Sequence, residues 1–169
     1  MSLSMYQASV PVFERMLANL TAILKKGEAH AQAHKFDPQV LVDARLYPDM
    51  FSIPKQVQIA CDMAKNGTAR LAGIEPPKFE DNERTLAELY ARIDKTLDFI
   101  KTVKPEQIDG SEERKVEIIT RGKPRAFTGQ RYLFEFVLPN LFFHVTTAYD
   151  ILRHNGVELG KRDYIGPHE

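Results

Sequence analysis

Hydrophobic residues recur at helical spacing in four long segments of the chain. The first segment has apolar residues separated by three or four positions, which places them on one face of a helix: Tyr6, Val10, Phe13, Leu17, Leu20 and Leu24. Pro11 lies within this stripe and either kinks the helix or marks its first turn. The segment EAHAQAH, residues 28–34, can extend the helix by about two turns.

The second long helix follows an extended connection. Asp37 before Pro38 is an N-cap followed by proline, which predicts a short helix over 38–45. Ser52 is the predicted N-cap of the long helix, which ends at Gly73, before Pro76 and Pro77. The small residues in its apolar stripe, Ala60 and Ala64, let a neighbouring helix come close. The whole stripe is Ile53, Val57, Ala60, Ala64 and Leu71.

The third long helix opens with a capping-box pattern, Thr85 with Glu88 three residues later, and ends at Pro105. After it, the β-branched run KVEIIT, the turn RGKP and the run RAFT predict a two-stranded hairpin beginning at residue 115. The fourth long helix is predicted from about Gln130 to His154, with Pro139 bending it.

These elements predict an all-α protein, an up-down four-helix bundle in one domain over residues 1–169. Its features are a long connection between the first two helices and a small β-hairpin between the third and fourth.

Charge and composition narrow the functional classes. Lysine plus arginine and aspartate plus glutamate each number 23, so the net charge is zero. We therefore expect neither nucleic acid nor an anionic membrane as a partner, because both select basic surfaces. The single cysteine, Cys61, excludes an internal disulfide and a cysteine-based zinc cluster. With no signal peptide and no apolar stretch of about 20 residues, a cytoplasmic protein is expected.

Zero net charge also does little to oppose self-association. The run FEFVLPNLFF, residues 134–143, has more aromatic residues than one core stripe needs. A partner subunit or the hairpin would cover the excess, and we expect a homodimer.

His144 is the main candidate for chemistry. It shares a largely apolar helix face with Asn140, and it is either a buried neutral histidine or part of a site. The second long helix offers Gln56, Gln58 and Asp62 as possible partners, and Gln58 and Asp62 share one of its faces. Meeting His144 across the bundle, they would line a polar pocket, as bundle sites are built from facing helices. Tyr149 is a further candidate, since with Arg153 it either frames an anion pocket or lies on the surface.

Other candidates are weaker. His30 and His34 are four residues apart, which is zinc-ligand spacing, but no HExxH pattern surrounds them, and we interpret them as solvated surface residues. Cys61 with His144 as its base could form a nucleophilic pair, although a lone cysteine on an apolar helix face is more often a core residue.

Two stretches of the chain resemble a known family: LYPDMFSIPKQVQIACDMAKNGTARLAG and LPNLFFHVTTAYDILRHNGVELGKRDYIG. They are similar to a bacterial family of uncharacterised domains within the DinB-like (YfiT-like) four-helix-bundle superfamily. The resemblance implies a core nickel or zinc ion held by three histidines, one from the second helix and two from the fourth. It also implies dimers, and in some relatives thiol-dependent transferase or isomerase activity.

This chain departs from that pattern. The resemblance places the two histidines of the fourth helix at Asn140 and His144, and that of the second helix at Gln58. Met63 stands where close relatives are expected to have a histidine. Since amide side chains bind nickel or zinc poorly compared with imidazole, the metal site is expected to be degraded, leaving weak divalent-metal binding as an alternative to no cofactor.

Three functions stay open. The favoured interpretation is an unknown small molecule bound in a polar pocket formed by His144, Asn140, Gln58, Asp62 and Tyr149. The alternatives are a metal- or thiol-dependent enzyme and a dimeric structural or interaction protein.

Overall fold

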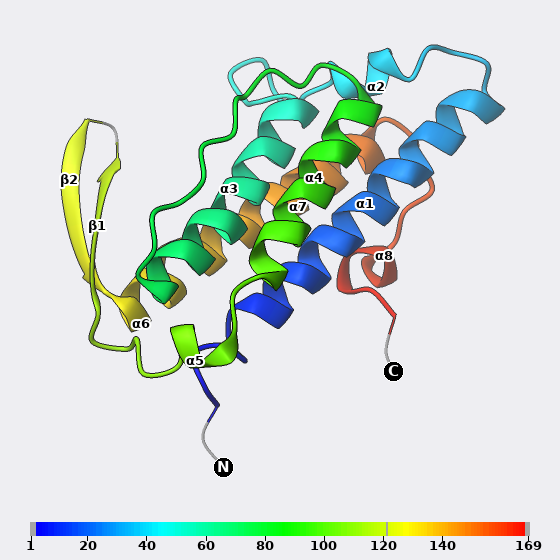
Figure 1. Cartoon of the computed structure of the whole chain (residues 1–169). Coiled ribbons are helices and arrows are strands. Elements are labelled where there is room, and N and C mark those ends of the chain that lie inside the picture. Colours follow the sequence, from blue (N-terminus) through cyan, green and yellow to red (C-terminus); the bar gives the residue numbers. More distant parts are fainter. Residues whose placement is uncertain (1–2, 121, 168–169) are drawn as a thin grey trace.

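The structure is a computed structural model that describes residues 3–120 and 122–167. Four long helices lie side by side (Figure 1): α1 (Val10–Ala33), α3 (Ile53–Ala72), α4 (Leu86–Lys101) and α7 (Leu138–His154). The shorter elements are α2 (Gln39–Val42), α5 (Pro105–Ile108), β1 (Lys115–Thr120), β2 (Lys123–Thr128), α6 (Gly129–Arg131), the π-helix η1 (Tyr132–Val137) and α8 (Lys161–Ile165). The predicted four-helix bundle, its long first connection and its hairpin are confirmed.

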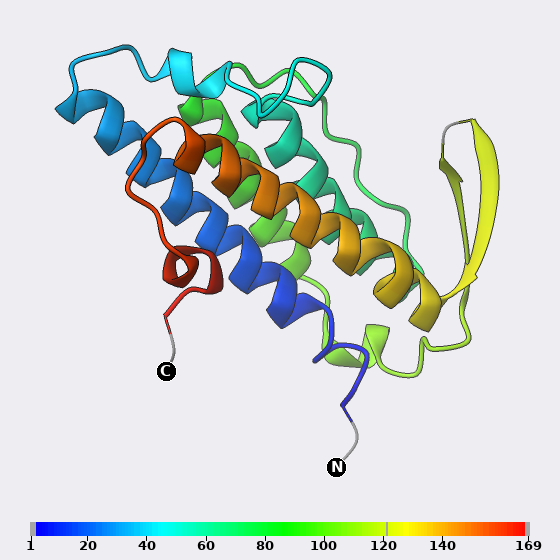
Figure 2. The same ribbon diagram turned by 180° about the vertical axis from the view of Figure 1, so that it is seen from behind.

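The direction of the helices differs from simple up-down alternation. α1 and α7 run one way, and α3 and α4 both run the other way (Figures 1 and 2). Between α3 and α4, residues 73–85 return along the length of the bundle. An extended segment of 13 residues can span about 43 Å. A 20-residue helix such as α3 is about 30 Å long, so the connection is long enough to make two consecutive helices parallel.

Local sequence signals set the helix ends. Pro11 lies in the first turn of α1, which continues to Ala33, so this proline begins the helix and does not kink it. The capping box of α4 is formed, with the Thr85 hydroxyl accepting from the Glu88 N–H and the Glu88 carboxylate accepting from the Thr85 N–H. The short helix expected over 38–45 covers only Gln39–Val42.

The fourth long helical stretch contains a six-residue π-helix. α6, η1 and α7 follow one another without a break, and η1 ends two residues before Pro139. Proline has no N–H to give to the preceding turn, so the helical hydrogen-bond ladder is interrupted there. A wider turn accommodates the interruption, and the bend predicted at Pro139 takes the form of this π-helical segment.

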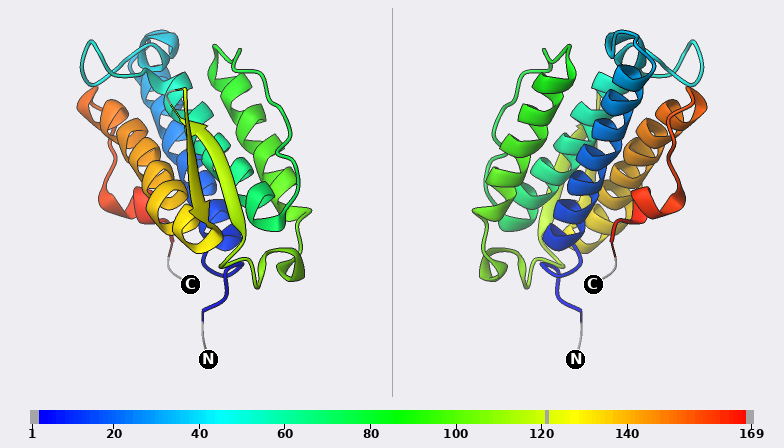
Figure 3. Two further views of the ribbon diagram at one scale, coloured as in Figure 1. Left: turned by 90° about the vertical axis from the view of Figure 1, so that its left-hand side faces the viewer. Right: turned by 90° about the vertical axis from the view of Figure 1, so that its right-hand side faces the viewer.

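The hairpin stands beside the end of α3 (Figures 1 and 3). β1 and β2 pair antiparallel, with Val116 opposite Phe127 and Ile118 opposite Arg125. Val116, Ile118 and Phe127 are buried, and the Phe127 ring lies 6.0 Å from the buried Tyr132 ring of η1. The turn includes Arg121, which lies outside the described residues.

A close approach between α1 and α7 depends on glycine. A Cβ atom added at Gly27 would lie 3.2 Å from a Leu152 methyl carbon. Gly27, which weakens the helix pattern in the sequence, therefore has a packing role. Among the described residues, no helix is both long enough and apolar enough to cross a membrane.

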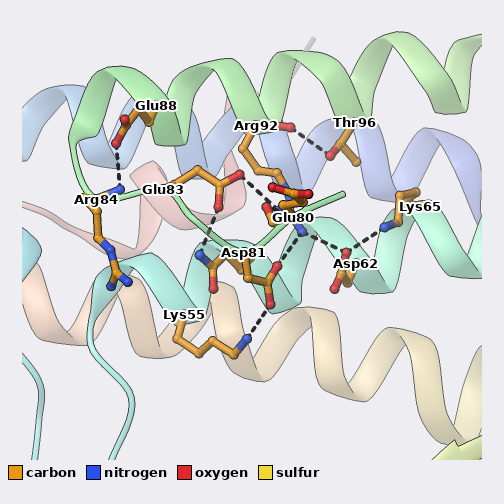
Figure 4. Close-up of polar contacts among 11 residues, drawn as sticks. Lys55, Asp62, Lys65, Glu80, Asp81, Glu83, Arg84, Glu88, Arg92 and Thr96 are labelled. Atoms are coloured by element: carbon orange, nitrogen blue, oxygen red, sulfur yellow. Dashed lines mark hydrogen bonds and ion pairs between the residues drawn. The ribbon is translucent and has the colours of Figure 1, made fainter. Parts of the chain in front are cut away.

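A buried ion-pair network holds the return connection (Figure 4). The Arg92 side chain of α4 is only 1% exposed. Its guanidinium donates to Asp62 of α3 at 3.0 Å, to Asp81 at 3.1 Å and to Glu83 at 3.0 Å. It also donates to the Glu80 carbonyl oxygen at 2.9 Å. Arg92 thus joins both parallel helices to residues 80–83.

Further contacts complete this Arg92 network. The buried Lys65 pairs with Asp62 at 2.9 Å, and Lys55 pairs with Asp81 at 2.6 Å. The Phe79 ring lies under three cations, with the ammonium groups of Lys65 and Lys95 4.4 and 4.2 Å from its centroid. The ion pairs thus join three carboxylates to three basic side chains: Asp62, Asp81 and Glu83 to Arg92, Lys55 and Lys65. Their charges balance, which compensates the charge that Arg92 brings into the interior.

We expect Arg92→Met to lower the free energy of unfolding by about 3–5 kcal/mol, because it leaves three carboxylates without their shared partner. Urea denaturation followed by circular dichroism measures this loss. Arg131→Ala is the matched control, since it breaks an exposed arginine–carboxylate pair with Glu135 and should change stability little. Equal losses in both variants would contradict a structural role for Arg92.

Candidate functional site

His144 lies on the face of α7 that meets α3, and it is 8% exposed. Its Nδ1 is 2.7 Å from Oε1 of the buried Gln56. Nε2 of Gln56 donates to the Phe51 carbonyl oxygen at 3.0 Å. A carbonyl only accepts, so this second bond orients the Gln56 amide, and Oε1 accepts from Nδ1–H of His144. The proton is therefore on Nδ1, and Nε2 carries a lone pair.

The imidazole is neutral and one of its edges meets the surface. Burial lowers the pKa of His144 to about 4. Nε2 has no hydrogen-bond partner among the described residues, and it is not one of the fully buried unpaired polar atoms. The neighbouring Phe143 ring contacts the imidazole edge-on at 5.2 Å and is 56% exposed. His144 thus presents a hydrogen-bond acceptor beside an exposed aromatic ring.

The structure does not bring Gln58 and Asp62 to His144. The Gln58 amide donates to Glu83 at 2.9 Å, and Asp62 accepts from Arg92 and Lys65. Both belong to the Arg92 network on the α4 side of α3. Residues two apart on a helix differ by about 200° around its axis, so Gln56 and Gln58 face opposite sides. The partner of His144 is therefore Gln56.

Asn140 and Tyr149 also have other partners. The Asn140 side-chain amide donates to the Phe136 carbonyl oxygen at 2.7 Å, at the junction of η1 and α7. It supports the backbone near Pro139. The Tyr149 ring packs edge-on against Tyr164 of α8, with centroids 6.4 Å apart. The five predicted pocket residues thus occupy four separate environments.

Cys61 is a core residue and not a partner of His144. It is fully buried on α3, and burial raises the pKa of its thiol to about 12, opposed by a hydrogen bond with Thr96 of α4. A thiol with this pKa stays protonated at neutral pH, so the nucleophilic interpretation has no support.

Three surface cavities of the described residues lie away from His144. One of about 750 Å³ separates β1 from the end of α3, with Arg70, Arg114 and Glu117 in its wall. One of about 420 Å³ lies beside Phe79 and Arg92. A third, of about 1020 Å³, lies between the last turns of α1 and residues 157–163. His144 lines none of these three.

Comparison with protein families identifies the chain. The model of a domain of unknown function, DUF1993, matches residues 5–165. The chain belongs to this family. No curated protein matches it. A crystal structure of a DinB family member protein from Shewanella denitrificans is 45% identical in sequence, with a TM-score of 0.87 over 96% of this chain and 92% of that chain. The predicted resemblance to an uncharacterised DinB-like family is confirmed.

The DUF1993 chain does not have the donor set of a three-histidine metal centre. His144 is the one imidazole at the implied position, and the oxygen of its partner Gln56 already accepts the ring N–H. No group of three His, Cys, Asp or Glu side chains within residues 3–120 and 122–167 could hold a metal ion. A neutral amide is a poor ligand for nickel or zinc, so the residues at His144 do not fit that ion.

Sequence reasoning overlooked Arg92 of this DUF1993 protein, and it considered Gln56 as a partner of His144 but did not include it in the predicted pocket. Gln56 follows Ile53 by three positions and precedes Ala60 by four, so its place in the apolar stripe was a signal of burial. Arg92 likewise stands between Leu89 and Thr96 on the inner face of α4. A polar residue in an apolar stripe needs a partner, and both have one.

We expect His144 to make the protein less stable in acid. Its folded pKa, about 4, lies below the unfolded value near 6.5, so the unfolded state binds more protons and stability falls as pH drops through this window. The full pKa shift corresponds to about 3 kcal/mol of folding stability. The expected loss is smaller, because one edge of the ring meets solvent. Urea denaturation of wild type and His144→Gln between pH 4 and 7 measures the difference. Parallel pH profiles would contradict this expectation.

Proposed function

We propose that this DUF1993 protein binds a small molecule at the Nε2 edge of His144, where a metal site of the DinB-like kind has been lost. One observation carries the proposal: Gln56 accepts a hydrogen bond from Nδ1–H, which leaves Nε2 as an acceptor of fixed orientation that is not fully buried. A histidine held in one tautomer by a second residue is the usual arrangement at binding and catalytic sites.

The chemistry of this edge selects the ligand class. An imidazole with a pKa of about 4 is a poor general base at neutral pH, because effective bases have a pKa near the working pH. It accepts a hydrogen bond instead of taking a proton. The exposed Phe143 ring beside it supplies apolar contact area. The expected ligand therefore has an aromatic or apolar body and a hydroxyl or N–H donor.

Phenol and anisole test this selection, since both are aromatic and only phenol has a donor. We expect phenol to shift the Nε2 resonance of His144 in a ¹⁵N-edited NMR titration and anisole to leave it unchanged. His144→Gln should abolish the response of Phe143 to phenol, whereas His154→Gln, an exposed histidine at the end of α7, should keep it. Equal shifts with both probes would refute the donor requirement.

The alternative enzyme interpretation has a distinct result. Elemental mass spectrometry that finds one equivalent of nickel or zinc in purified wild type, and none in His144→Gln, would overturn the proposal. It would support a metal-dependent activity of the DinB-like kind.

We also propose that the protein is a homodimer whose interface includes the outer face of α7. Phe142 and Phe143 of α7 and Phe134 of η1 are exposed, and in Figure 2 no described element lies in front of α7. Large exposed aromatic side chains are enriched in interfaces, and a net charge of zero leaves little repulsion between copies. A partner over Phe143 would also enclose the solvent side of His144.

Sedimentation velocity at micromolar concentration tests the dimer. Phe142→Asp should convert dimer to monomer, because it places a charge in an apolar contact. Ile119→Asp is the matched control, since this exposed residue lies on β1, away from α7, and should leave the dimer intact. A wild-type monomer would exclude the proposed assembly.

A further inference from the structure

We infer a second site of different chemistry at the last turn of α1, where His30 and His34 form a bidentate site for a divalent transition metal. The two imidazole rings lie with centroids 4.2 Å apart and planes 35° from each other. Histidines four apart on a helix project from the same side, so both rings can reach one ion. His30 lies in the last turn of α1 and His34 is its C-cap residue, and both are separate from His144 and Gln56.

The His34 ring is held in a metal-binding tautomer. Its Nδ1 lies 2.9 Å from the His30 carbonyl oxygen, which also accepts the His34 backbone N–H at 3.0 Å. Because a carbonyl only accepts, Nδ1 carries the ring proton and Nε2 has the free lone pair. A ring N–H given to a backbone carbonyl is the common outer contact of metal-bound histidine, where it fixes ring orientation.

The His30 ring is confined between neighbours. The Phe36 ring contacts it edge-on at 5.9 Å, and Cε1 and Nε2 of His30 lie 3.8 Å from the position of a Cβ on Gly156. His30 and His34 both line the cavity of about 1020 Å³ between α1 and residues 157–163. This space admits a hydrated ion. Glu158 lines the same cavity.

The donor set selects the class of ion. Imidazole nitrogen favours Cu²⁺, Ni²⁺ and Zn²⁺ over Mg²⁺ and Ca²⁺, which prefer oxygen ligands. Since the described residues contain no third His, Cys, Asp or Glu placed to complete the site, water fills the remaining positions. The sequence spacing alone indicates solvated surface residues, and the structure adds the proximity of the two rings and the fixed tautomer of His34.

Calorimetric titration of the full chain with Ni²⁺ tests the site, together with paramagnetic resonance of the Cu²⁺ form. We expect one equivalent of Ni²⁺ and two coordinated imidazole nitrogens in wild type. His30→Gln and His34→Gln should each weaken Ni²⁺ binding on the order of tenfold or more and leave one coordinated imidazole. Both residues are at the surface end of α1, and circular dichroism checks that the variants fold.

The control variants are His154→Gln, His168→Gln and His144→Gln, which should bind Ni²⁺ like wild type. Unchanged affinity in His30→Gln and His34→Gln would overturn the inference, as would a loss confined to any of the three controls. Because the phenol titration reports on His144 alone, failure of the Ni²⁺ site leaves that result intact, and failure of phenol binding leaves the Ni²⁺ site intact.

Discussion

The buried charge of Arg92 is the constraint on which the arrangement of the bundle depends. A guanidinium in the interior needs carboxylates around it, and two of the three come from the return connection at residues 81 and 83. The network therefore holds residues 80–83 against both α3 and α4 and makes their parallel packing possible. Buried ion pairs often contribute more to the choice of one arrangement than to stability, and here the arrangement is the path of one connection.

This constraint also explains why the site at His144 is small. On the α4 side of α3, Gln58 and Asp62 belong to the Arg92 network and Cys61 belongs to the core. Only Gln56 is left to face α7, so His144 gains one polar partner and not a cluster. The carboxylate of Asp62, which could have helped to hold a metal ion, is paired with Arg92 and Lys65. The proposed ligand at His144 is therefore one that donates a hydrogen bond to Nε2, and not an ion held by three histidines.

The same local device appears at both histidine sites of this DUF1993 protein. In each, an oxygen accepts a hydrogen bond from Nδ1–H and leaves the Nε2 lone pair free: Oε1 of Gln56 for His144, and the His30 carbonyl oxygen for His34. The surroundings decide what the free nitrogen does. His144 stands alone beside Phe143, where a single acceptor suits a hydroxyl or N–H group. His34 has a second imidazole within reach, and two nitrogens suit a metal ion.

The sequence by itself determined the elements whose signals are local. The Thr85–Glu88 capping box and the β-branched run 115–120 act on neighbouring backbone, so the start of α4 and the hairpin follow from them. Pro11 left a kink and a first turn both open, and the structure decided for the first turn. The similarity of two long stretches also indicated the family. Tertiary structure alone decided that residues 73–85 return along the bundle and that Gln56, not Gln58, meets His144. A helix rotates about 100° per residue, so an alignment shift of two positions exchanges its faces, and only packing against the other helices sets that rotation.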